Sequence, residues 1–589
     1  MKKRIAVIHK DKCNHVGCGD YLCAKLCPVN RTNEECIKKG DDTTNKAVID
    51  ETLCTGCGIC TKRCPFEAIE VINLPNNLNK DPIHRYGENS FALFSLPTPL
   101  FGKVTGVLGK NAIGKSTAFK ILAGLIKANL GQHGAEIEFK EIIKYFKGTE
   151  MQKFLEKLQK NEINLSYKPQ QVELIPKQFN GTVKELLEKI DQKNMFNEVV
   201  EKLSLKHFLD TNIRKVSGGE LQRVAIAAAV LKDSNLILFD EPSSYLDIKQ
   251  RIKVSNYIRS LSNENNSILV IEHDLIILDF ITELLNIMYG KDSVYGIVSG
   301  IKNTREGINS FLEGFLKEEN VRFRSNAIKF EASQDKVKGI PIELISWKDI
   351  ELKLGNFVLK SPEGYLNKKE IVGILGENGT GKSTFVKVLA GVQKLNKGKI
   401  NSEIKVSYKP QYLDFSDNSM LVAEFLHEAV TDYTNQLIKP LDLEKLFGKK
   451  MSQLSGGELQ RTVIAHCLSK NAELFLLDEP SAYLDIEQRL IVSKVIKRIT
   501  EEREITMLVV DHDLMFLDYI SERLIVFSGT PAKEGIVEGP FSMEDGMNKF
   551  LADLDITLRR DHNSKRPRIN KPGSVKDREQ KAAKKLYYC

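Results

Sequence analysis

The sequence GKNAIGKS at residues 109–116 returns as GENGTGKS at residues 376–383. Each copy follows an apolar run, at 104–108 or 371–375, and precedes a segment expected to be helical, at 117–123 or 384–390. The phosphate-binding loop requires this strand–loop–helix context, because its glycines let backbone N–H groups and the helix N-terminus approach a phosphate. The two loops therefore predict an α/β protein with two nucleotide sites.

Charged and hydroxyl side chains in the loops have separate expected tasks. Lys115 and Lys382 bring a positive charge to the β- and γ-phosphates, and Ser116 and Ser383 ligate Mg²⁺. Further ATP contacts are expected from Gly109, Asn111, Gly114 and Thr117 in the first loop, and from Gly376, Asn378, Gly379, Gly381 and Thr384 in the second.

More motifs follow each loop in the same order. They are YKPQ (Gln170; Gln411), SGGELQR (217–223; 455–461), an apolar strand ending in Asp-Glu-Pro (Asp240, Glu241; Asp478, Glu479), Tyr-Leu-Asp (Asp247; Asp485) and a final His-Asp (His273; His512). From SGGELQR onward the halves repeat at a spacing of 238 or 239 residues. So many motifs in one order exclude chance, and the chain is an internal repeat of one nucleotide-binding unit.

Nine of the eleven cysteines lie within the first 64 residues. Cys54, Cys57, Cys60 and Cys64, followed by proline, have the spacing of bacterial ferredoxins, in which the fourth cysteine ligates the other cluster of a pair. Cys13, Cys18, Cys23 and Cys27 form a looser run with the same ending. Crossing the fourth ligands predicts two [4Fe–4S] clusters, one on Cys54, Cys57, Cys60 and Cys27, and one on Cys13, Cys18, Cys23 and Cys64. The alternative is a pair of zinc sites, and Cys36, Cys467 and Cys589 are expected to be packing or surface thiols.

Composition limits the class of protein. With 42% apolar and 28% charged residues, the chain resembles an ordinary soluble protein, and no apolar run reaches the length of a membrane helix. No secretory signal is evident, so a cytoplasmic location is expected. Residues 559–589 contain eleven Lys or Arg and three Asp or Glu, which account for the whole net charge of +8. This basic tail either meets a polyanion such as RNA or is a solvated, disordered end.

The halves differ between the phosphate loop and YKPQ, where the first half is 26 residues longer. Residues 144–160 of this insertion predict a charged amphipathic helix, which serves either as a docking device or as a tolerated surface elaboration. A second repeat, GINSFL at 307–312 and GMNKFL at 546–551, follows the two units. Arginines come after each copy, at 322 and 324 and at 559 and 560, and suggest paired hinge segments that contact RNA or pair with acidic groups.

Over residues 85–530 the motifs resemble those of ATP-binding-cassette (ABC) proteins, and we call the two units cassettes. The resemblance implies two composite sites, in which the nucleotide on Lys115 is closed by Ser455 and Gly457 and that on Lys382 by Ser217 and Gly219. It also implies that Asp240 and Asp478 hold Mg²⁺ with Gln170 and Gln411, that Glu241 and Glu479 polarise the attacking water, and that His273 and His512 contact the γ-phosphate. The remaining implied ATP contacts are Gly218, Glu220, Gly456, Glu458, Asp247 and Asp485, with Tyr86, Phe91 and Phe357 as candidates for stacking on adenine.

The combination of a two-cluster ferredoxin-like domain, twin cassettes, a one-sided insertion and paired hinges resembles subfamily E of the ABC proteins, the RNase L inhibitor family. That family splits ribosomes into subunits after termination or stalling, together with a release factor or a Pelota-type rescue factor. The resemblance implies contacts with the small subunit and its rRNA, a link to initiation factors, ATP hydrolysis to ADP, and a cluster domain that moves as a lever. It also implies a monomer in which the two cassettes of one chain pair.

The expected architecture is an N-terminal α+β ferredoxin-like domain at 1–75 and two α/β nucleotide-binding domains in tandem. The first nucleotide-binding domain spans 76–292, with its helical insertion at about 142–165, and is followed by hinge segment 1 at 293–340. The second nucleotide-binding domain spans 341–530 and is followed by hinge segment 2 and the tail at 531–589. Two other readings stay open: a redox-coupled ATPase that drives electrons from the clusters, and the ATPase subunit of a transporter.

Overall fold

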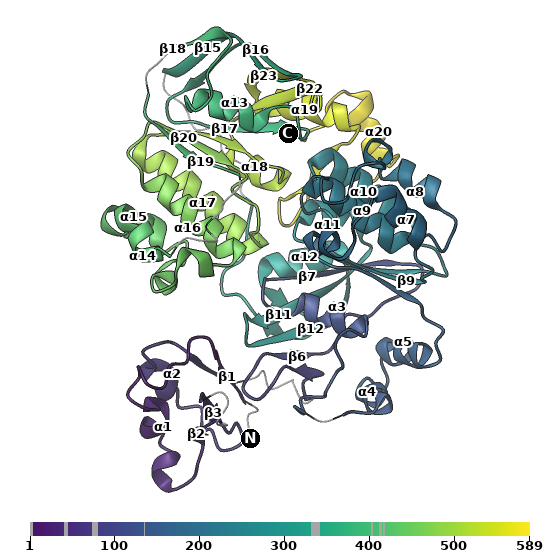
Figure 1. The fold of residues 1–589 in the computed structure, drawn as a ribbon, viewed down its shortest axis with the longest axis vertical. Coiled ribbons are helices and arrows are strands. Elements are labelled where there is room, and N and C mark those ends of the chain that lie inside the picture. The colour runs from purple at the N-terminus through teal and green to yellow at the C-terminus, as the bar shows by residue number, and fades with distance from the viewer. Residues whose placement is uncertain are drawn as a thin grey trace.

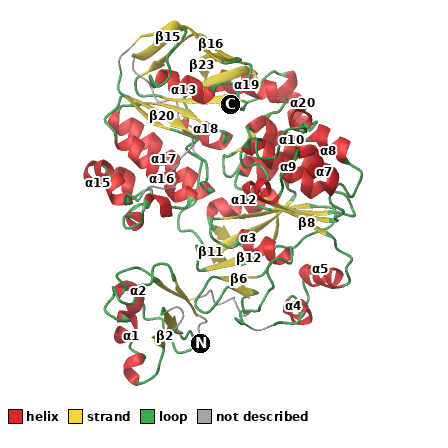
Figure 2. Ribbon diagram, viewed as in Figure 1, coloured by secondary structure: helices red, strands yellow, loops and turns green. Residues whose placement is uncertain are grey.

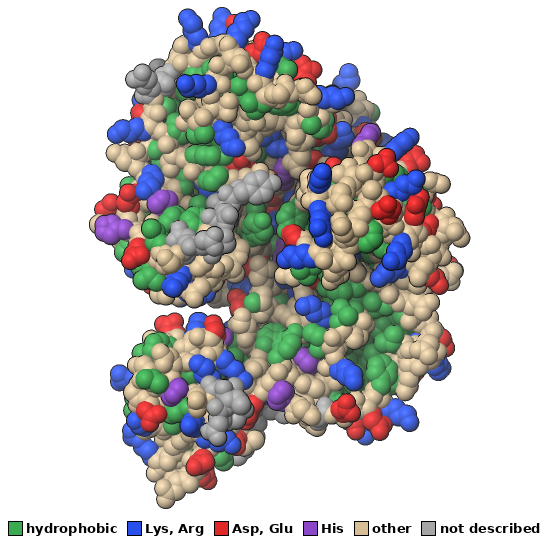
Figure 3. All heavy atoms as spheres, viewed as in Figure 1, with side chains coloured by type: hydrophobic (Ala, Val, Ile, Leu, Met, Phe, Trp, Pro, Cys, Tyr) green, Lys and Arg blue, Asp and Glu red, His purple; other side chains and the backbone are tan. Residues whose placement is uncertain are grey.

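The computed structural model describes residues 4–40, 45–73, 81–134, 136–330, 342–401, 404–411, 415 and 419–588. Figure 1 shows a small N-terminal domain at the bottom, the first cassette beside and above it, and the second cassette at the top. In the space-filling view the N-terminal domain projects below the second cassette and joins the rest of the molecule through the first (Figure 3). No helix among the described residues is long and apolar enough to cross a membrane.

Short elements make up the N-terminal domain. They are β1 (Arg4–Ile8), α1 (Leu22–Leu26), η1 (Asn30–Thr32), β2 (Ile37–Lys39), β3 (Ala47–Ile49), α2 (Ile59–Arg63) and β4 (Ile69–Asn73). β1 pairs antiparallel with β4, so the first and last strands of the domain close on each other. The small core combines apolar residues such as Ile37 and Ile49 with Cys27, Cys36 and Cys60. This is the α+β domain that the sequence predicts.

The first cassette is built on an eight-stranded sheet in the order β5-β6-β12-β11-β7-β10-β9-β8. Its strands are β5 (His84–Arg85), β6 (Ala92–Phe94), β7 (Val104–Gly109), β8 (Leu165–Lys168), β9 (Leu236–Asp240), β10 (Ser267–Ile271), β11 (Leu284–Lys291) and β12 (Tyr295–Asn303). β7, which leads into the phosphate loop, lies between β10 and β11 and is parallel to both. Because these strands are buried on both faces, they read as continuous apolar runs rather than as alternating ones.

The second cassette repeats this plan in a nine-stranded sheet, ordered β18-β15-β16-β23-β22-β17-β21-β20-β19. Its strands are β15 (Glu343–Leu354), β16 (Phe357–Asn367), β17 (Ile371–Gly376), β18 (Lys397–Asn401), β19 (Val406–Lys409), β20 (Leu474–Asp478), β21 (Thr506–Val510), β22 (Arg523–Thr530) and β23 (Glu534–Ser542). β17 lies between β21 and β22, as β7 lies between β10 and β11. The internal repeat in the sequence is therefore a repeat of topology.

Helices cover the sheets, as Figure 2 shows. Those of the first cassette are α3 (Lys115–Leu122), α4 (Phe139–Tyr145), α5 (Glu150–Gln159), α6 (Ile175–Gln178), α7 (Val183–Ile190), α8 (Phe196–Lys202), α9 (Gly218–Leu231), α10 (Ile248–Ser260), α11 (Leu275–Ile281) and α12 (Thr304–Glu313). Those of the second are α13 (Lys382–Leu389), α14 (Val422–Phe425), α15 (His427–Asp432), α16 (Gly456–Ser469), α17 (Ile486–Arg503), α18 (Leu514–Ile520) and α19 (Met543–Leu554).

The insertion in the first cassette differs from its prediction. One helix was expected over 144–160, but the structure has two, α4 and α5, separated by a turn at Gly148 with φ +80°. A right-handed helix cannot continue through that conformation. The apolar side of α5, formed by Met151, Phe154 and Leu155, is buried in the core of the first cassette.

The two sheets run beyond residues 292 and 530, where the sequence suggested that the cassettes end. β12 and β23 lie past those positions, and each pairs antiparallel with the strand before it. The repeated GINSFL and GMNKFL segments form the helices α12 and α19. Gly307 and Gly546 let these helices pack closely on the sheets, because an added Cβ would lie 2.8 Å from Leu285 and 2.7 Å from Leu524.

The basic tail is folded, so of its two alternatives the solvated, disordered end is wrong. It forms β24 (Leu558–Arg560), which pairs with β25 (Pro567–Ile569), followed by α20 (Val575–Ala582). The side chain of Arg566 has no exposed surface, and Arg568 is 14% exposed. Part of the tail's positive charge is therefore used inside the protein.

Candidate active site

The two phosphate loops connect β7 to α3 and β17 to α13. The Lys115 ammonium donates to the carbonyl oxygens of Gly109 at 2.9 Å and of Lys110 at 2.5 Å. Lys382 donates in the same way to Gly376 and Glu377, at 2.8 Å each. Burial lowers the pKa of Lys382 to about 8 and lowers that of Lys115 as well. Each loop thus curls around its own ammonium group, the arrangement that presents the charge to a phosphate.

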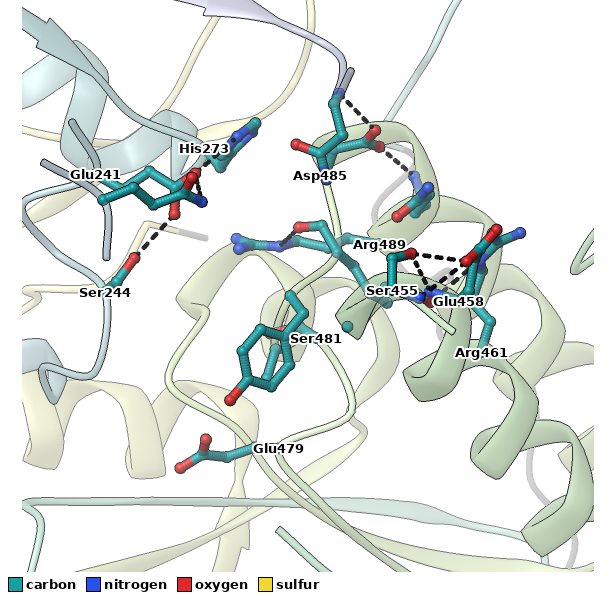
Figure 4. A pocket seen from close by; sticks show the side chains of 18 of the residues that line it. Glu241, Ser244, His273, Ser455, Glu458, Arg461, Glu479, Ser481, Asp485 and Arg489 are labelled. Carbon is teal, nitrogen blue, oxygen red and sulfur yellow. Dashed lines mark hydrogen bonds and ion pairs between the residues drawn. The ribbon is translucent and has the colours of Figure 1, made fainter. Parts of the chain in front are cut away.

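The catalytic residues expected in the first cassette lie around the acidic pair Asp240 and Glu241, at the end of β9. Gln170 donates its amide to Glu241 Oε1 at 2.8 Å, and His273 Nε2 lies 3.5 Å from the same oxygen. Burial and the charge of Glu241 raise the pKa of Asp240, and the Ser116 hydroxyl acts in the opposite direction. Figure 4 shows Glu241 turned toward His273 and held from the other side by Ser244.

The second cassette has the same geometry. Gln411 donates to Glu479 Oε1 at 2.6 Å, and His512 Nε2 lies 3.5 Å from that oxygen. Burial raises the pKa of the neighbouring Asp478, and the Ser383 hydroxyl acts in the opposite direction. The amide groups of Gln170 and Gln411 thus contact the glutamates, and their expected contact with Mg²⁺ stays a prediction.

The two glutamates differ in their electrostatics. Burial would raise the pKa of Glu241, but His273 and Lys115 outweigh burial and lower the pKa to about 2. Burial and the negative charges of Asp511 and Asp478 raise the pKa of Glu479 to about 7. The residue before the final histidine is Glu272 in the first half and Asp511 in the second. The two sites are alike in geometry, but the pKa of the glutamate is lowered in the first and raised in the second.

Two further pairs of residues shape the site and were missed in the sequence analysis. Lys168 donates to the carbonyl oxygens of Asp240 at 2.8 Å and of Glu241 at 3.1 Å, and Gln222 donates to the same Glu241 carbonyl at 2.7 Å. Lys409 and Gln460 make the equivalent bonds in the second cassette. Glu241 and Glu479 have φ of 49°, which is uncommon for a residue other than glycine, and these bonds fix that conformation. The signal was available, because the lysine and glutamine recur in the repeated YKPQ and SGGELQR motifs.

The SGGE segments open α9 and α16 as capping boxes. Ser217 accepts from the Glu220 N–H, and the Glu220 carboxylate accepts from the N–H and hydroxyl of Ser217 at 2.8 Å each. Ser455 and Glu458 do the same. The carboxylates of Glu220 and Glu458 cap the helices, and the expected contact of these residues with the nucleotide stays a prediction. The capped helices present free N–H groups, including those of Gly218, Gly219, Gly456 and Gly457, at a positive helix end.

A cavity of about 2230 Å³ is lined by residues of both cassettes. It is lined by the phosphate loops, the two SGGE segments and the Glu–His pairs of both cassettes, and Figure 4 shows Ser455 and Glu458 across from Glu241. Asp485 of the second cassette accepts from the Asn111 N–H of the first loop at 3.2 Å. Asp247 of the first cassette accepts from the Asn378 N–H of the second loop at 3.0 Å. The cassettes are thus already joined head to tail, each aspartate touching the other's phosphate loop.

The three aromatic residues predicted to stack on adenine divide into two kinds. Phe91 and Phe357 lie at equivalent positions, because their rings pack beneath Gly114 and Gly381 of the two loops. Phe357 lines the large cavity. Tyr86 lies to the side of the loop, with its hydroxyl 3.0 Å from Thr117 Oγ1, and is half exposed.

The crossed cysteine sets come together in the N-terminal domain. Cys13, Cys18, Cys23 and Cys64 line one small cavity. Burial and the neighbouring thiols of Cys54, Cys57 and Cys27 raise the pKa of Cys60 to about 11. Within the described ranges, no group of three or more His, Cys, Asp or Glu side chains is placed to hold a metal ion. The crossed ligand sets therefore stay a prediction, which the shared cavity of Cys13, Cys18, Cys23 and Cys64 supports for one of the two clusters.

The cysteines outside these sets have different surroundings. Burial and the neighbouring thiols of Cys27 and Cys54 raise the pKa of Cys36. Cys36 therefore lies next to the set that contains Cys27 and Cys54, and not at a surface. Cys467 is buried in the second cassette, where its sulfur lies 3.2 Å from the Ser407 hydroxyl. Cys589 lies outside the described residues.

The N-terminal domain contacts the end of β11. Lys291, the last residue of β11, lies 2.7 Å from Glu70 of β4, and in the turn that follows, the Ser293 N–H donates to the Ala112 carbonyl in the first phosphate loop at 2.9 Å. His9 and Lys291 outweigh burial and lower the pKa of Glu70 to about 2. The end of β11 therefore touches the cysteine domain, and the turn directly after it touches the phosphate loop.

The tail joins the two cassettes through a repeated aspartate that the sequence analysis did not single out. Asp279 in α11 binds Arg568 Nη2 at 3.0 Å through one carboxylate oxygen and Arg566 at 3.2 Å through the other. Its equivalent in α18, Asp518, binds Arg560 and accepts from the hydroxyl of Tyr588 at 3.0 Å. Three arginines of the basic tail thus pair with acidic groups of the cassettes.

Taken together, the topology of the two sheets and the paired composite sites define an ATP-binding-cassette protein. Residues 100–244 and 359–482 match the ABC transporter family, and residues 47–70 match the 4Fe-4S binding domain family, which favours iron–sulfur over zinc. The chain is 43% identical over 99% of its length to ABC transporter E family member 1 of Arabidopsis thaliana, and covers 98% of it.

Solved structures narrow the class further. A model of ribosome-bound archaeal Pelota and ABCE1 contains a chain 48% identical to this one, with a TM-score of 0.93 and 100% of each chain covered. The archaeal ribosome recycling factor aABCE1, crystallised with the ribosomal stalk protein aP1, is 48% identical with a TM-score of 0.83, and the match covers 87% of this chain and 100% of that one. The chain belongs to the E family of ABC proteins, also called the RNase L inhibitor family.

Proposed function

We propose that this protein is an ATP-driven ribosome recycling factor, which splits ribosomes into subunits together with a release factor or a Pelota-type rescue factor. The observation that carries the proposal is one continuous set of contacts. Lys291 at the end of β11 contacts the cysteine domain and Ser293 in the following turn contacts the first phosphate loop, so a change at the nucleotide would reach that domain through a few residues. The likeness to ribosome-bound ABCE1 and to a ribosome recycling factor supplies the biological setting.

Each composite site has the groups needed for hydrolysis. Ser116 with Asp240, and Ser383 with Asp478, would hold Mg²⁺ at the β- and γ-phosphates. Glu241 and Glu479 would orient the attacking water and accept its proton, while His273 and His512 would bind the γ-phosphate. The N–H groups at Gly457 and Gly219 would reach that phosphate only when the cassettes close, so ATP acts as the glue between them.

The clusters have a structural role in this proposal. Each crossed set of four thiolates would hold one [4Fe–4S] cluster. A domain of short strands and five-residue helices has too little core to be stiff by itself, and the clusters make it a rigid lever. Closing of the cassettes would move the lever against the ribosome, and the small subunit and its rRNA would retain the closed protein.

Sedimentation of ribosomes tests the function. Purified ribosomes, this protein, ATP and a Pelota-type factor are run on a sucrose gradient, with omission of each component as the control. Free subunits are expected only when all components are present. Intact ribosomes in the complete mixture, with ATP hydrolysis proceeding, would contradict the proposal. Cluster reduction coupled to ATP turnover, followed by absorbance, would instead support the redox-coupled alternative.

A further inference from the structure

Two ion pairs cross the cassette interface beside the nucleotide loops. Lys110, the second residue of the first phosphate loop, lies 2.6 Å from Glu487 in α17 of the second cassette. Glu377, the second residue of the other loop, lies 2.5 Å from Lys249 in α10 of the first cassette. Lys110 and Glu377 occupy equivalent positions in the two loops. Lys249 and Glu487 occupy equivalent positions in the two helices, because each comes two residues after the aspartate that bonds the opposite loop.

The signs of the two pairs are opposite. At the first site the loop carries the positive charge and the facing helix the negative one, whereas at the second site the loop is negative and the helix positive. Two copies of the first cassette would bring Lys110 against Lys249, and two copies of the second would bring Glu377 against Glu487. Only the pairing of unlike cassettes brings opposite charges together at both sites.

We propose that these four residues form a charge code that selects the pairing of the first cassette with the second and rejects the pairing of like cassettes from two chains. Like charges across an interface suppress wrong partners, and rim charges of this kind act mainly on specificity. The inference rests on the ATP-dependent closing of the cassettes in the proposed function, but not on any contact with ribosomes.

The two pairs do not contribute equally. Lys110 and Glu487 are 28% and 19% exposed, whereas Lys249 and Glu377 are 53% and 32% exposed, so solvent screens the second pair more strongly. Arg324 of hinge segment 1 also binds Glu487, and donates in addition to the Phe311 carbonyl at 2.8 Å. The Lys110–Glu487 pair therefore contributes more to the selection of the partner cassette, and Arg324 connects this pair to hinge segment 1.

An exchange of the two loop charges tests the code at constant net charge. In the full-length variant Lys110→Glu/Glu377→Lys, unlike cassettes repel at both sites and like cassettes attract. We expect the ATP concentration for half-maximal hydrolysis to rise about tenfold, because attraction is lost and repulsion added at two partly exposed pairs. We also expect ATP-dependent dimers in sedimentation velocity, where the natural chain stays a monomer.

Two further variants make the result decisive. Adding Lys249→Glu and Glu487→Lys reverses the facing charges too, and should restore the monomer and bring the ATP dependence back to within about twofold. The matched control is Lys360→Glu/Glu534→Lys, which reverses an ion pair of 3.0 Å inside the second cassette and should behave like the natural chain. Persistent defects in the four-residue variant, or a monomer with unchanged ATP dependence in the loop variant, would overturn the code. These assays contain no ribosomes, so their failure is separate from failure of the recycling function.

Discussion

Replacement of Asp279 by alanine should free the C-terminal tail from the first cassette. Asp279 is 4% exposed and faces Arg566, which is fully buried, and Arg568, which is 14% exposed. Removing one partner of a buried ion pair costs about 3–5 kcal/mol, because the remaining charge is left unpaired. At about 1.4 kcal/mol for each factor of ten, we expect the tail to open between about 150-fold and a few thousand-fold more often. Hydrogen exchange of the amides in β24 and β25 measures this opening directly.

The control for Asp279→Ala is Glu283→Ala in the same cassette. Glu283 and Lys103 form an ion pair at 2.6 Å, but they are 44% and 48% exposed. Such a pair contributes about 0–1 kcal/mol, so exchange in the tail should change less than about fivefold. Equal exchange in the two variants would refute the reasoning, since it would mean that the buried arginines are solvated or paired elsewhere once the tail is in solution.

Three further changes test the site. The double variant Glu241→Gln/Glu479→Gln should lower hydrolysis by about 10²–10⁴-fold and remain on small subunits in ATP gradients, whereas free release would contradict the clamp. Lys168→Met should lower kcat by at least about tenfold at unchanged ATP binding, because the Glu241 carbonyl loses the charge-assisted hydrogen bond that holds its backbone. A changed ATP affinity with normal kcat would contradict this role of Lys168. Cys64→Ala should lower the iron content by about four atoms per chain while Cys467→Ala leaves it unchanged, and equal iron in the two variants would reject the crossed set.

The sequence by itself determined the two cassettes and the cysteine domain. Phosphate loops, SGGELQR and the Asp-Glu pair each perform a local task, since a loop wraps a phosphate and a capping box opens a helix whatever surrounds it. The spacing of the cysteines likewise restricts the domain to a few kinds of site. The two cassettes and the cysteine domain are confirmed. The structure also brings Glu241 to His273, Glu479 to His512, and Cys13, Cys18, Cys23 and Cys64 to one cavity.

Only the tertiary structure decided how distant segments meet. The arginines of the tail looked free for a polyanion, yet Arg566 is buried against Asp279, 287 residues away in the sequence. Partners so far apart leave no mark in spacing or periodicity, because the fold alone sets their distance. The pairing of Lys110 with Glu487 could not be predicted from the sequence for the same reason. The reversal of charge between the two repeats has an effect only when the two cassettes face each other.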